Sequence, residues 1–384
     1  MLEASSKGDK VARKIKPHYY SLDAIKAEHA HYNMIIGERS NGKTFAVLSE
    51  IVKNYYETGK QGAYIRRMSE DFTGKRGATL FEALIDSNGK NTISELTNGY
   101  WTSVYYYGSR WYLCNYVQRD NGEWDRESDE TPFCYGFALT ATEHEKGVGY
   151  PNITTICFDE FMTRHGYLRD EFVLFMNTLS TIIRQRDDVT IYMCGNTVNK
   201  YCPYFKEMGL RHIDKMKQGT IDVYAINHEY GEQLRIAVEY CKPNTKGKKS
   251  DFYFSFDNDK LKMITRGMWE IDIYPHCPIR YKPRNVLFTY FIEFEETLLQ
   301  CEVVQVDNMC FTYIHLKTTP LKYPDTELVY STRHSPKPNW KRRITNPSTL
   351  IEKRVYQFFM REKVFYQDNE IGEVVRNYLQ WCRQ

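Results

Sequence analysis

The sequence has no C-x-x-C pair, although ten cysteines are spread over its 384 residues. Zinc ribbons are built from such pairs, so this class of protein is not expected. No stretch approaches the roughly 20 apolar residues that cross a bilayer, and residues 1–14 are too polar for a signal peptide. We therefore expect no membrane partner, and we expect the cysteines to be free thiols of a reducing cytosol.

Net charge is also small, because 52 basic residues face 49 acidic ones and leave a formal charge of +3. Binding to nucleic acid requires clustered cations rather than a basic total, so this balance neither supports nor excludes such a partner. The remaining composition is ordinary, with 42% hydrophobic and 26% charged residues, and it is sufficient to form a core. The length predicts two domains or one large one.

After a charged lead-in with a short helix at 1–30, residues 31–205 alternate short apolar runs with amphipathic stretches. Apolar runs bounded by polar residues are typical of buried parallel strands, and they lie at His31–Gly37, Gly62–Arg66, Thr154–Phe158 and Thr190–Gly195. Apolar residues at helical spacing predict helices over Thr44–Tyr56 and Asp170–Arg184. This alternation predicts an α/β domain with a doubly wound sheet over residues 1–205. The aromatic-rich segment 70–150 is expected to be an inserted β-hairpin region.

The second half of the chain has a different pattern. Residues 206–250 are mixed and polar, and we expect a linker or a small lid subdomain there. From residue 251 apolar strands follow one another closely, and those within 286–317 predict an antiparallel meander with a turn at Asp307-Asn308. Two helices are expected near 348–364 and 369–382. Residues 251–384 are therefore predicted to form a smaller α+β domain.

Residues 37–44 read GERSNGKT and match the phosphate-binding loop G-x-x-x-x-G-K-[ST] at every defined position. The motif follows an apolar strand and opens an amphipathic helix, which is the context that it requires. Its backbone N–H groups can surround phosphate oxygens at a helix N-terminus that favours anions. The predicted nucleotide-binding residues are Gly37, Glu38, Arg39, Ser40, Asn41, Gly42, Lys43 and Thr44. Lys43 is expected at the β- and γ-phosphates and the Thr44 hydroxyl on Mg²⁺.

Two further strands end in polar residues. The run TTICFDE (154–160) ends in Asp159, expected to hold Mg²⁺ through its water shell, and in Glu160, expected to polarise the attacking water. The run TIYMCGN ends in Asn196, which either contacts the γ-phosphate and lytic water or only forms a turn. No N-K-x-D motif follows, so ATP is preferred over GTP as the cofactor.

Arginines near these strands have two interpretations that sequence alone leaves open. Arg184 and Arg186 lie at the end of the expected helix, where a cation complements the helix dipole. An arginine supplied to a neighbouring site could equally stabilise transition-state charge, a contribution of roughly 10³–10⁵ in rate. Arg66 and Arg67, after the second strand, are open to both interpretations.

Together these residues resemble the genome-packaging ATPases of phi29-like tailed bacteriophages. The resemblance includes the P-loop, the YIRR strand at 64–67 and a collinear block from YPNITTICFDEF (150–161) through IIRQRDD (182–188) to GN (195–196) and PYF (203–205). It covers the first 200 residues well, whereas the remainder matches only in general pattern.

The resemblance implies a P-loop NTPase domain of the ASCE type that works in a pentameric ring on the portal of a procapsid in the host cytoplasm. Arg184 matches the catalytic arginine that a neighbouring subunit supplies, and Lys146 matches a basic residue supplied in the same way. Double-stranded DNA, the portal and other copies of the chain are the implied partners, and the use of a structural RNA is left open. Lys75 and Arg76 match channel-facing loop positions.

The resemblance also implies an RNase H-like domain at 251–384 that has lost the acids of a two-metal nuclease. Glu293, Glu295, Glu296 and Asp307 are expected to be exposed hairpin charges, and the basic stretch Lys337–Arg343 either binds phosphates or is a solvated loop. Two other functional classes stay open. One is a helicase or a terminase with a working nuclease, and the other is a nucleotide-regulated scaffold that does not hydrolyse ATP.

Overall fold

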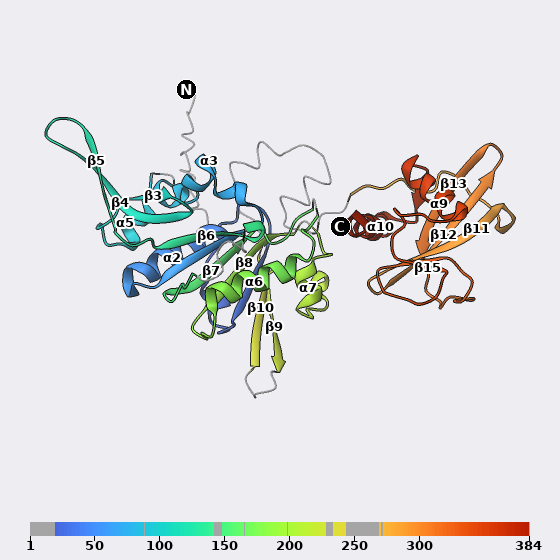
Figure 1. Ribbon diagram of the computed structural model, residues 1–384, viewed down its shortest axis with the longest axis horizontal. Coiled ribbons are helices and arrows are strands. Elements are labelled where there is room, and N and C mark those ends of the chain that lie inside the picture. Colours follow the sequence, from blue (N-terminus) through green and yellow to red (C-terminus); the bar gives the residue numbers. More distant parts are fainter. Residues whose placement is uncertain are drawn as a thin grey trace, which may run out of the picture. The chain divides into compact units, whose positions relative to one another are not determined.

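The computed structural model describes residues 20–87, 89–141, 148–164, 166–197, 199–227, 233–242, 269 and 272–383. The chain divides into two compact units, each with its own sheet (Figure 1). Unit 1 consists of residues 1–161, 174–197 and 212–268, and unit 2 of residues 162–173, 198–211 and 269–384. The division into three domains with boundaries at 205 and 250 stays a prediction.

Unit 1 contains a ten-stranded sheet with the order β3-β4-β6-β2-β7-β8-β1-β10-β9, and β5 pairs with β4. The strands are β1 (Tyr32–Gly37), β2 (Gln61–Arg66), β3 (Ser103–Tyr107), β4 (Arg110–Gln118), β5 (Trp124–Ser128), β6 (Cys134–Ala138), β7 (Ile153–Asp159), β8 (Thr190–Asn196), β9 (Thr220–Asn227) and β10 (Gln233–Tyr240). The four strands expected from apolar runs are present as β1, β2, β7 and β8.

The centre of this sheet is parallel, from β6 through β2, β7, β8 and β1 to β10. Antiparallel strands extend both edges, through β3, β4 and β5 on one side and β9 on the other. Within the segment 206–250, residues 233–240 form β10 and pair with β1 inside the main sheet. Only Ile236, Ala237 and Val238 give that strand an apolar centre, which was too short to distinguish it from its polar surroundings.

Helices cover both faces of the parallel centre. Helix α2 (Lys43–Thr58) packs on β2 and β7, and Cys157 belongs to the core on its side. The next residue, Phe158, stacks on Phe175 of α6 (Glu171–Ile183) with ring centroids 4.8 Å apart. Successive strand residues point to opposite faces, so the two helices lie on opposite sides of β7, as a doubly wound sheet requires. Shorter helices in unit 1 are α1 (Asp23–Lys26), α3 (Gly74–Ala78), α4 (Glu82–Ile85) and α5 (Thr92–Leu96).

Unit 2 contains a six-stranded sheet with the order β15-β14-β11-β12-β13-β16. The expected meander is confirmed as antiparallel β11 (Val286–Phe294), β12 (Thr297–Val306) and β13 (Met309–Leu316). Three short strands pair in parallel with their neighbours, namely β14 (Val329–Ser331), β15 (Trp340–Lys341) and β16 (Val364–Tyr366). The helices of this unit are α7 (Pro203–Glu207), α9 (Leu350–Met360) and α10 (Asn369–Arg383). The helix expected to reach residue 364 therefore ends at Met360, because Val364–Tyr366 pairs with β13 instead.

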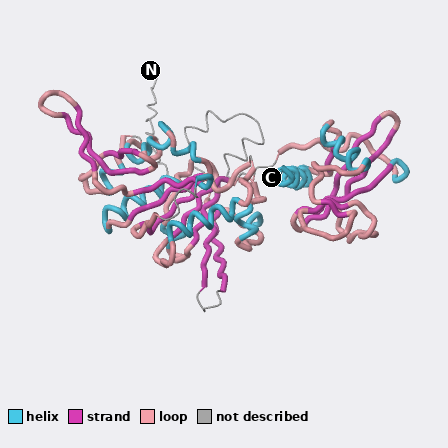
Figure 2. Tube along the Cα trace, in the orientation of Figure 1, coloured by secondary structure: helices cyan, strands magenta, loops and turns pink. Residues whose placement is uncertain are grey.

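Cysteine burial agrees with the sequence. Eight of the ten cysteines are buried and all ten are free thiols, and Cys277 and Cys310 are half-buried. Figure 2 shows strands, in magenta, together with helices and loops in both units. Among the described residues, none of the helices combines the length and the apolar character that crossing a membrane would need.

Candidate functional site

The P-loop joins the end of β1 to the start of α2. Gly42 is the N-cap of α2 and has φ 93°, a left-handed conformation that favours glycine. Arg39 and Ser40 are exposed at the tip of the loop, whereas the Glu38 and Asn41 side chains are buried. The loop therefore presents the free N–H groups of a 16-residue helix at one end of the parallel strands.

Lys43 lies inside this loop and is only 6% exposed. Its ammonium donates to the Glu38 carbonyl oxygen at 2.6 Å, to Asn41 Oδ1 at 3.2 Å and to Asn196 Oδ1 at 3.3 Å. Burial lowers the pKa of Lys43, and the surrounding acidic groups oppose this shift. A buried ammonium held by three neutral oxygens is a strong ligand for an anion, because phosphate oxygens would replace those acceptors and add charge.

Asp159 closes the other side of the site. The Thr44 hydroxyl donates to Asp159 Oδ1 at 2.9 Å, and the Tyr64 hydroxyl of β2 donates to Asp159 Oδ2 at 2.8 Å. Burial and the neighbouring carboxylate raise the pKa of Tyr64 well above its usual value, so this phenol remains a donor. The hydroxyl and the carboxylate expected to share one metal ion therefore lie in direct contact.

Glu160 follows Asp159 in a left-handed conformation with φ 53°. Its side chain is 60% exposed and pairs with the Arg66 guanidinium at 3.0 Å, which also lies 3.5 Å from Asp159. Arg67 donates to the carbonyl oxygens of Glu160 and Phe161 at 3.2 and 2.9 Å. Both arginines therefore support the acidic turn of their own chain.

Asn196 ends β8 beside Gly37, its register partner on β1. Since β8 lies between β1 and β7, its carboxyl end separates the P-loop from the two acids. The Asn196 side chain accepts a hydrogen bond from Lys43. This contact favours a role in the site over the simple turn that the sequence also allowed.

Arg184, a residue of the predicted set, lies elsewhere. Arg184 follows the end of α6, is exposed, and donates to the Val148 carbonyl oxygen at 2.8 Å. It precedes β8, whereas the P-loop lies beyond the other end of that strand, about 20 Å away at the usual rise per residue. Arg186 donates to the carbonyl oxygens of Tyr150 and Ile153, a structural role. Lys146 lies outside the described residues.

Sequence analysis missed Tyr64 and gave Arg66 no role in its own site. A cavity of about 310 Å³ adjoins both residues, and its wall includes Asp71, Arg76 and Trp111. Arg76 and Lys75 are exposed on α3. The only sequence signal for these roles was the position of YIRR at the end of a buried strand, where side chains reach the same edge as the other motifs.

In unit 2, Glu296 and Asp307 are exposed as expected, whereas Glu293 and Glu295 are not. Glu293 is on β11 rather than in an exposed turn, accepts a hydrogen bond from Ser331 of β14 at 2.7 Å and forms an ion pair with Arg333. The expectation of an exposed hairpin charge is therefore wrong for Glu293, because β14 pairs beside it. Glu295 is half-buried near Lys206, 3.8 Å away. Nowhere in the described ranges do three or more His, Cys, Asp or Glu side chains gather as metal ligands.

The basic stretch 337–343 is partly engaged within unit 2. Lys337 pairs with Asp325 at 2.7 Å, and Lys341 lies 3.5 Å from the buried Glu352. The Arg342 guanidinium lies 5.0 Å from the centre of the Trp381 ring. These contacts favour a structural role over a free phosphate-binding loop.

The chain is similar in sequence and in fold to known proteins. A family model described as Podovirus DNA encapsidation protein (Gp16) matches residues 130–218. The DNA packaging protein of Bacillus phage B103 is 25% identical over 274 residues, which cover 62% of this chain and 73% of that protein. The DNA packaging protein of Bacillus phage phi29 is 24% identical over 193 residues, half of each chain. The solved phi28 gp11 DNA packaging motor aligns over 96% of this chain and 97% of its own, with a TM-score of 0.51 and 16% identity. These matches confirm the resemblance seen in the sequence.

Proposed function

We propose that this chain, a relative of the DNA packaging proteins of phi29-like phages, is an ATP-hydrolysing motor that moves double-stranded viral DNA into a procapsid. It would act in a homo-oligomeric ring, with a pentamer expected, at the portal vertex in the host cytoplasm. The observation that carries this proposal is the 2.9 Å contact between Thr44 and Asp159, which joins two motifs 115 residues apart.

The residues present fit a nucleoside triphosphate and Mg²⁺. The fit to phosphate is the buried Lys43 ammonium, whose acceptors in the P-loop are neutral oxygens that an anion can replace. The fit to magnesium is the Thr44 hydroxyl beside the Asp159 carboxylate, because Mg²⁺ is usually held by one or two protein oxygens together with phosphates and water. When bound, Mg²⁺ would neutralise charge on the phosphates.

Hydrolysis would use Glu160 as the base that accepts a proton from the attacking water. Its carboxylate lies 3.0 Å from the Arg66 guanidinium, so Arg66 orients this base. Asn196 would contact the terminal phosphate or that water, since its side chain reaches Lys43. Each of these groups comes from the carboxyl end of a parallel strand, which gives the site its rigidity.

Arg184 would complete the site of a neighbouring copy. Its place at the opposite ends of the strands prevents it from reaching the P-loop of its own chain, and its exposure leaves it open to a neighbour. Lys146 is proposed in the same role by resemblance alone. An arginine supplied in this way contributes roughly 10³–10⁵ in rate, so an isolated chain should hydrolyse ATP slowly.

Unit 2 is proposed to be an RNase H-like domain without nuclease activity. The meander β11-β12-β13 with β14 added in parallel to β11 supports that fold. Glu293 supports the loss of cleavage, because its carboxylate is occupied by Ser331 and the Arg333 guanidinium rather than grouped with other acids. Two-metal cleavage needs several converging carboxylates. Incubation with plasmid and Mn²⁺ tests this point, and nicking that Glu293→Ala abolishes would refute it.

The central experiment measures packaging directly. Purified chain, portal-bearing procapsids, linear duplex DNA and ATP are combined, and DNA protected from added nuclease is quantified. The wild-type chain should protect DNA of any sequence, because contacts to the phosphate backbone carry no base information. Glu160→Gln should bind ATP normally yet lose hydrolysis by about 10²–10⁴ and protect no DNA. ATP binding without turnover in the wild-type chain would favour the scaffold, and unwinding of a forked duplex would favour a helicase.

A mixing experiment tests the role of Arg184. Chains carrying Arg184→Ala or Glu160→Gln should each be inactive alone. If the arginine acts on a neighbouring site, mixed assemblies regain part of the ATPase activity. In them a Glu160→Gln chain supplies Arg184 to the site of an Arg184→Ala neighbour, which still has its own Glu160. Arg169→Ala, at an arginine whose side chain is 82% exposed, is the control and should behave as wild type. Failure of the mixture to recover activity would refute the role in a neighbouring site.

A further inference from the structure

An acidic hairpin extends from the sheet of unit 1. Beyond Cys114, β4 pairs only with β5, so residues 115–127 form a two-stranded ribbon, here called the hairpin arm (Figure 1). The arm carries four carboxylates and two arginines. Trp124 stands on this arm with 69% of its surface exposed. An isolated two-stranded ribbon is marginally stable in water, and an exposed tryptophan among acids is suited to docking rather than to binding DNA.

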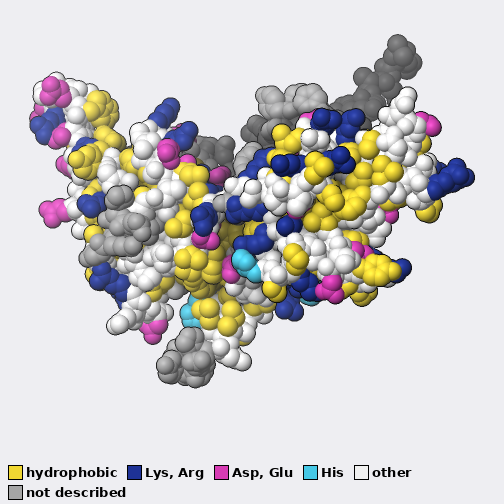
Figure 3. Space-filling view, turned by 45° about the vertical axis from the view of Figure 1, so that its right-hand side comes forward, with side chains coloured by type: hydrophobic (Ala, Val, Ile, Leu, Met, Phe, Trp, Pro, Cys, Tyr) yellow, Lys and Arg dark blue, Asp and Glu magenta, His cyan; other side chains and the backbone are white. Residues whose placement is uncertain are grey.

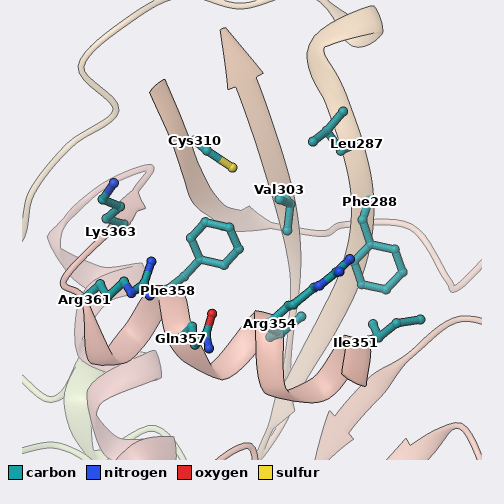
Figure 4. A pocket seen from close by; sticks show the side chains of 11 residues that line it. Leu287, Phe288, Val303, Cys310, Ile351, Arg354, Gln357, Phe358, Arg361 and Lys363 are labelled. Atoms are coloured by element: carbon teal, nitrogen blue, oxygen red, sulfur yellow. The ribbon is translucent and has the colours of Figure 1, made fainter. Parts of the chain in front are cut away.

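Unit 2 carries a surface with the opposite properties. Figure 4 shows a groove between α9 and the strands β11, β12 and β13, with a volume of about 490 Å³. Its floor is apolar and includes Phe288, Val303 and Phe358. Leu287 and Ile351 at its edge are 64% and 52% exposed. In Figure 3, hydrophobic side chains in yellow and basic side chains in dark blue lie beside one another on the right-hand side of the view.

The rim of this groove is basic. Arg354, Arg361 and Lys363 line it, and no acidic residue does so among those described. Among the residues that the structure describes, none forms an ion pair with any of these three cations. Below, the name basic-rimmed groove refers to this site. Its apolar floor and cationic edge match a segment that offers an aromatic anchor flanked by carboxylates.

We propose that the hairpin arm of one copy of this chain docks in the basic-rimmed groove of a second copy, with Trp124 as its apolar anchor. The arm and the groove are different surfaces, so the contact is heterologous. Successive copies then add in the same sense and close into a ring when the rotation permits. The inference specifies a contact for the ring of the proposed function, and it does not require ATP turnover.

Cross-linking tests the contact itself. Cys310 is half-buried and lines the groove, so it provides a native attachment point. A chain with Glu123→Cys and Cys310→Ser is mixed with wild-type chain and treated with a short bismaleimide, and linked peptides are mapped by mass spectrometry. A link between residues 123 and 310 in a covalent dimer can only join two chains. Tyr107→Cys in place of Glu123→Cys is the matched control, because Tyr107 is also 69% exposed but lies outside the arm.

Charge reversal tests the recognition. Sedimentation velocity should show self-association that weakens with salt and falls roughly thirtyfold in Trp124→Ser. Arg354→Glu with Arg361→Glu should weaken it similarly, whereas Lys353→Glu, next in sequence but outside the groove, should not. Adding Glu123→Lys and Glu127→Lys to the groove double variant should restore association.

Three results would overturn the proposal: a wild-type chain that stays monomeric, absence of the 123–310 link, or no restoration by the combined reversals. A groove variant that loses DNA or portal binding while self-association is unchanged would assign the groove to that other partner. ATP binding, measured in every variant, confirms that unit 1 is folded. A failure of docking is thereby separated from a failure of the ATPase.

Discussion

Tyr64→Phe removes one oxygen atom from the site and tests whether Asp159 must be held in place to act. The Tyr64 hydroxyl donates to Asp159 at 2.8 Å, and its ring is only 5% exposed. Partners that orient a metal-binding group typically contribute 10–100-fold to metal affinity or activity. We therefore expect the Mg²⁺ concentration that half-activates the ATPase to rise by roughly that factor. Binding of ATP without Mg²⁺ should not change, because Lys43 and the P-loop are intact.

The assay is a magnesium titration of ATPase activity at saturating ATP, on wild type and variant in parallel. Tyr192→Phe is the matched control, since Tyr192 is a buried tyrosine of β8, the strand on the other side of β7. The loss of one hydrogen bond should lower the free energy of unfolding by only about 1–3 kcal/mol, so both proteins should be folded at 25 °C. An unchanged magnesium dependence in Tyr64→Phe would show that Asp159 is positioned without this phenol, and would refute the reasoning.

Three further outcomes follow from the described contacts. Because burial lowers the pKa of Lys43, ATP binding should weaken and take up a proton as pH rises through that lowered value, which calorimetry in buffers of different ionisation enthalpy detects. Glu302, with a pKa of about 2, lies 3.6 Å from His315, whose pKa is raised mainly by that carboxylate. The pair should therefore stabilise unit 2 most between the unfolded values near pH 4.5 and 6.5, and less as pH rises through the raised histidine pKa. Chemical denaturation of His315→Gln at pH 6 and 8 should show a difference from wild type that shrinks at the higher pH. Gly62→Ala would place a Cβ 2.4 Å from Ile51, which should cost about 1–3 kcal/mol of unfolding free energy, and thermal unfolding should show partial recovery when Ile51→Ala is added.

Local sequence was sufficient where one segment carries both the structure and the chemistry. The P-loop is such a case, because Gly42 supplies the left-handed turn and Lys43 and Thr44 follow it at the helix start. The meander of unit 2 was predictable for a similar reason, since its strands are consecutive and their turns are short.

Contacts between distant segments could not be predicted in this way. Tyr64 looks like an ordinary core residue of β2, and only the pairing of β2 with β7 brings its hydroxyl to Asp159. Glu293 was misjudged because the parallel addition of β14 is not visible in the residues around it. Strand β10 could not be predicted for the same reason, because its few apolar residues do not indicate a strand until the pairing with β1 is known.

The order of the parallel strands explains why the site is built at one edge and why it is incomplete there. The carboxyl ends of β1, β2, β7 and β8 carry, in turn, the P-loop, Arg66, the two acids and Asn196. Every group that binds phosphate or polarises water in the proposed mechanism therefore comes from that edge. Helix α6 crosses back over the sheet after β7 and therefore ends at the opposite edge. Arg184, which follows this helix, lies away from the site of its own chain. If this arginine is needed for catalysis, hydrolysis depends on assembly. The rate per chain should then rise steeply with protein concentration in the wild type and remain flat in Arg184→Ala.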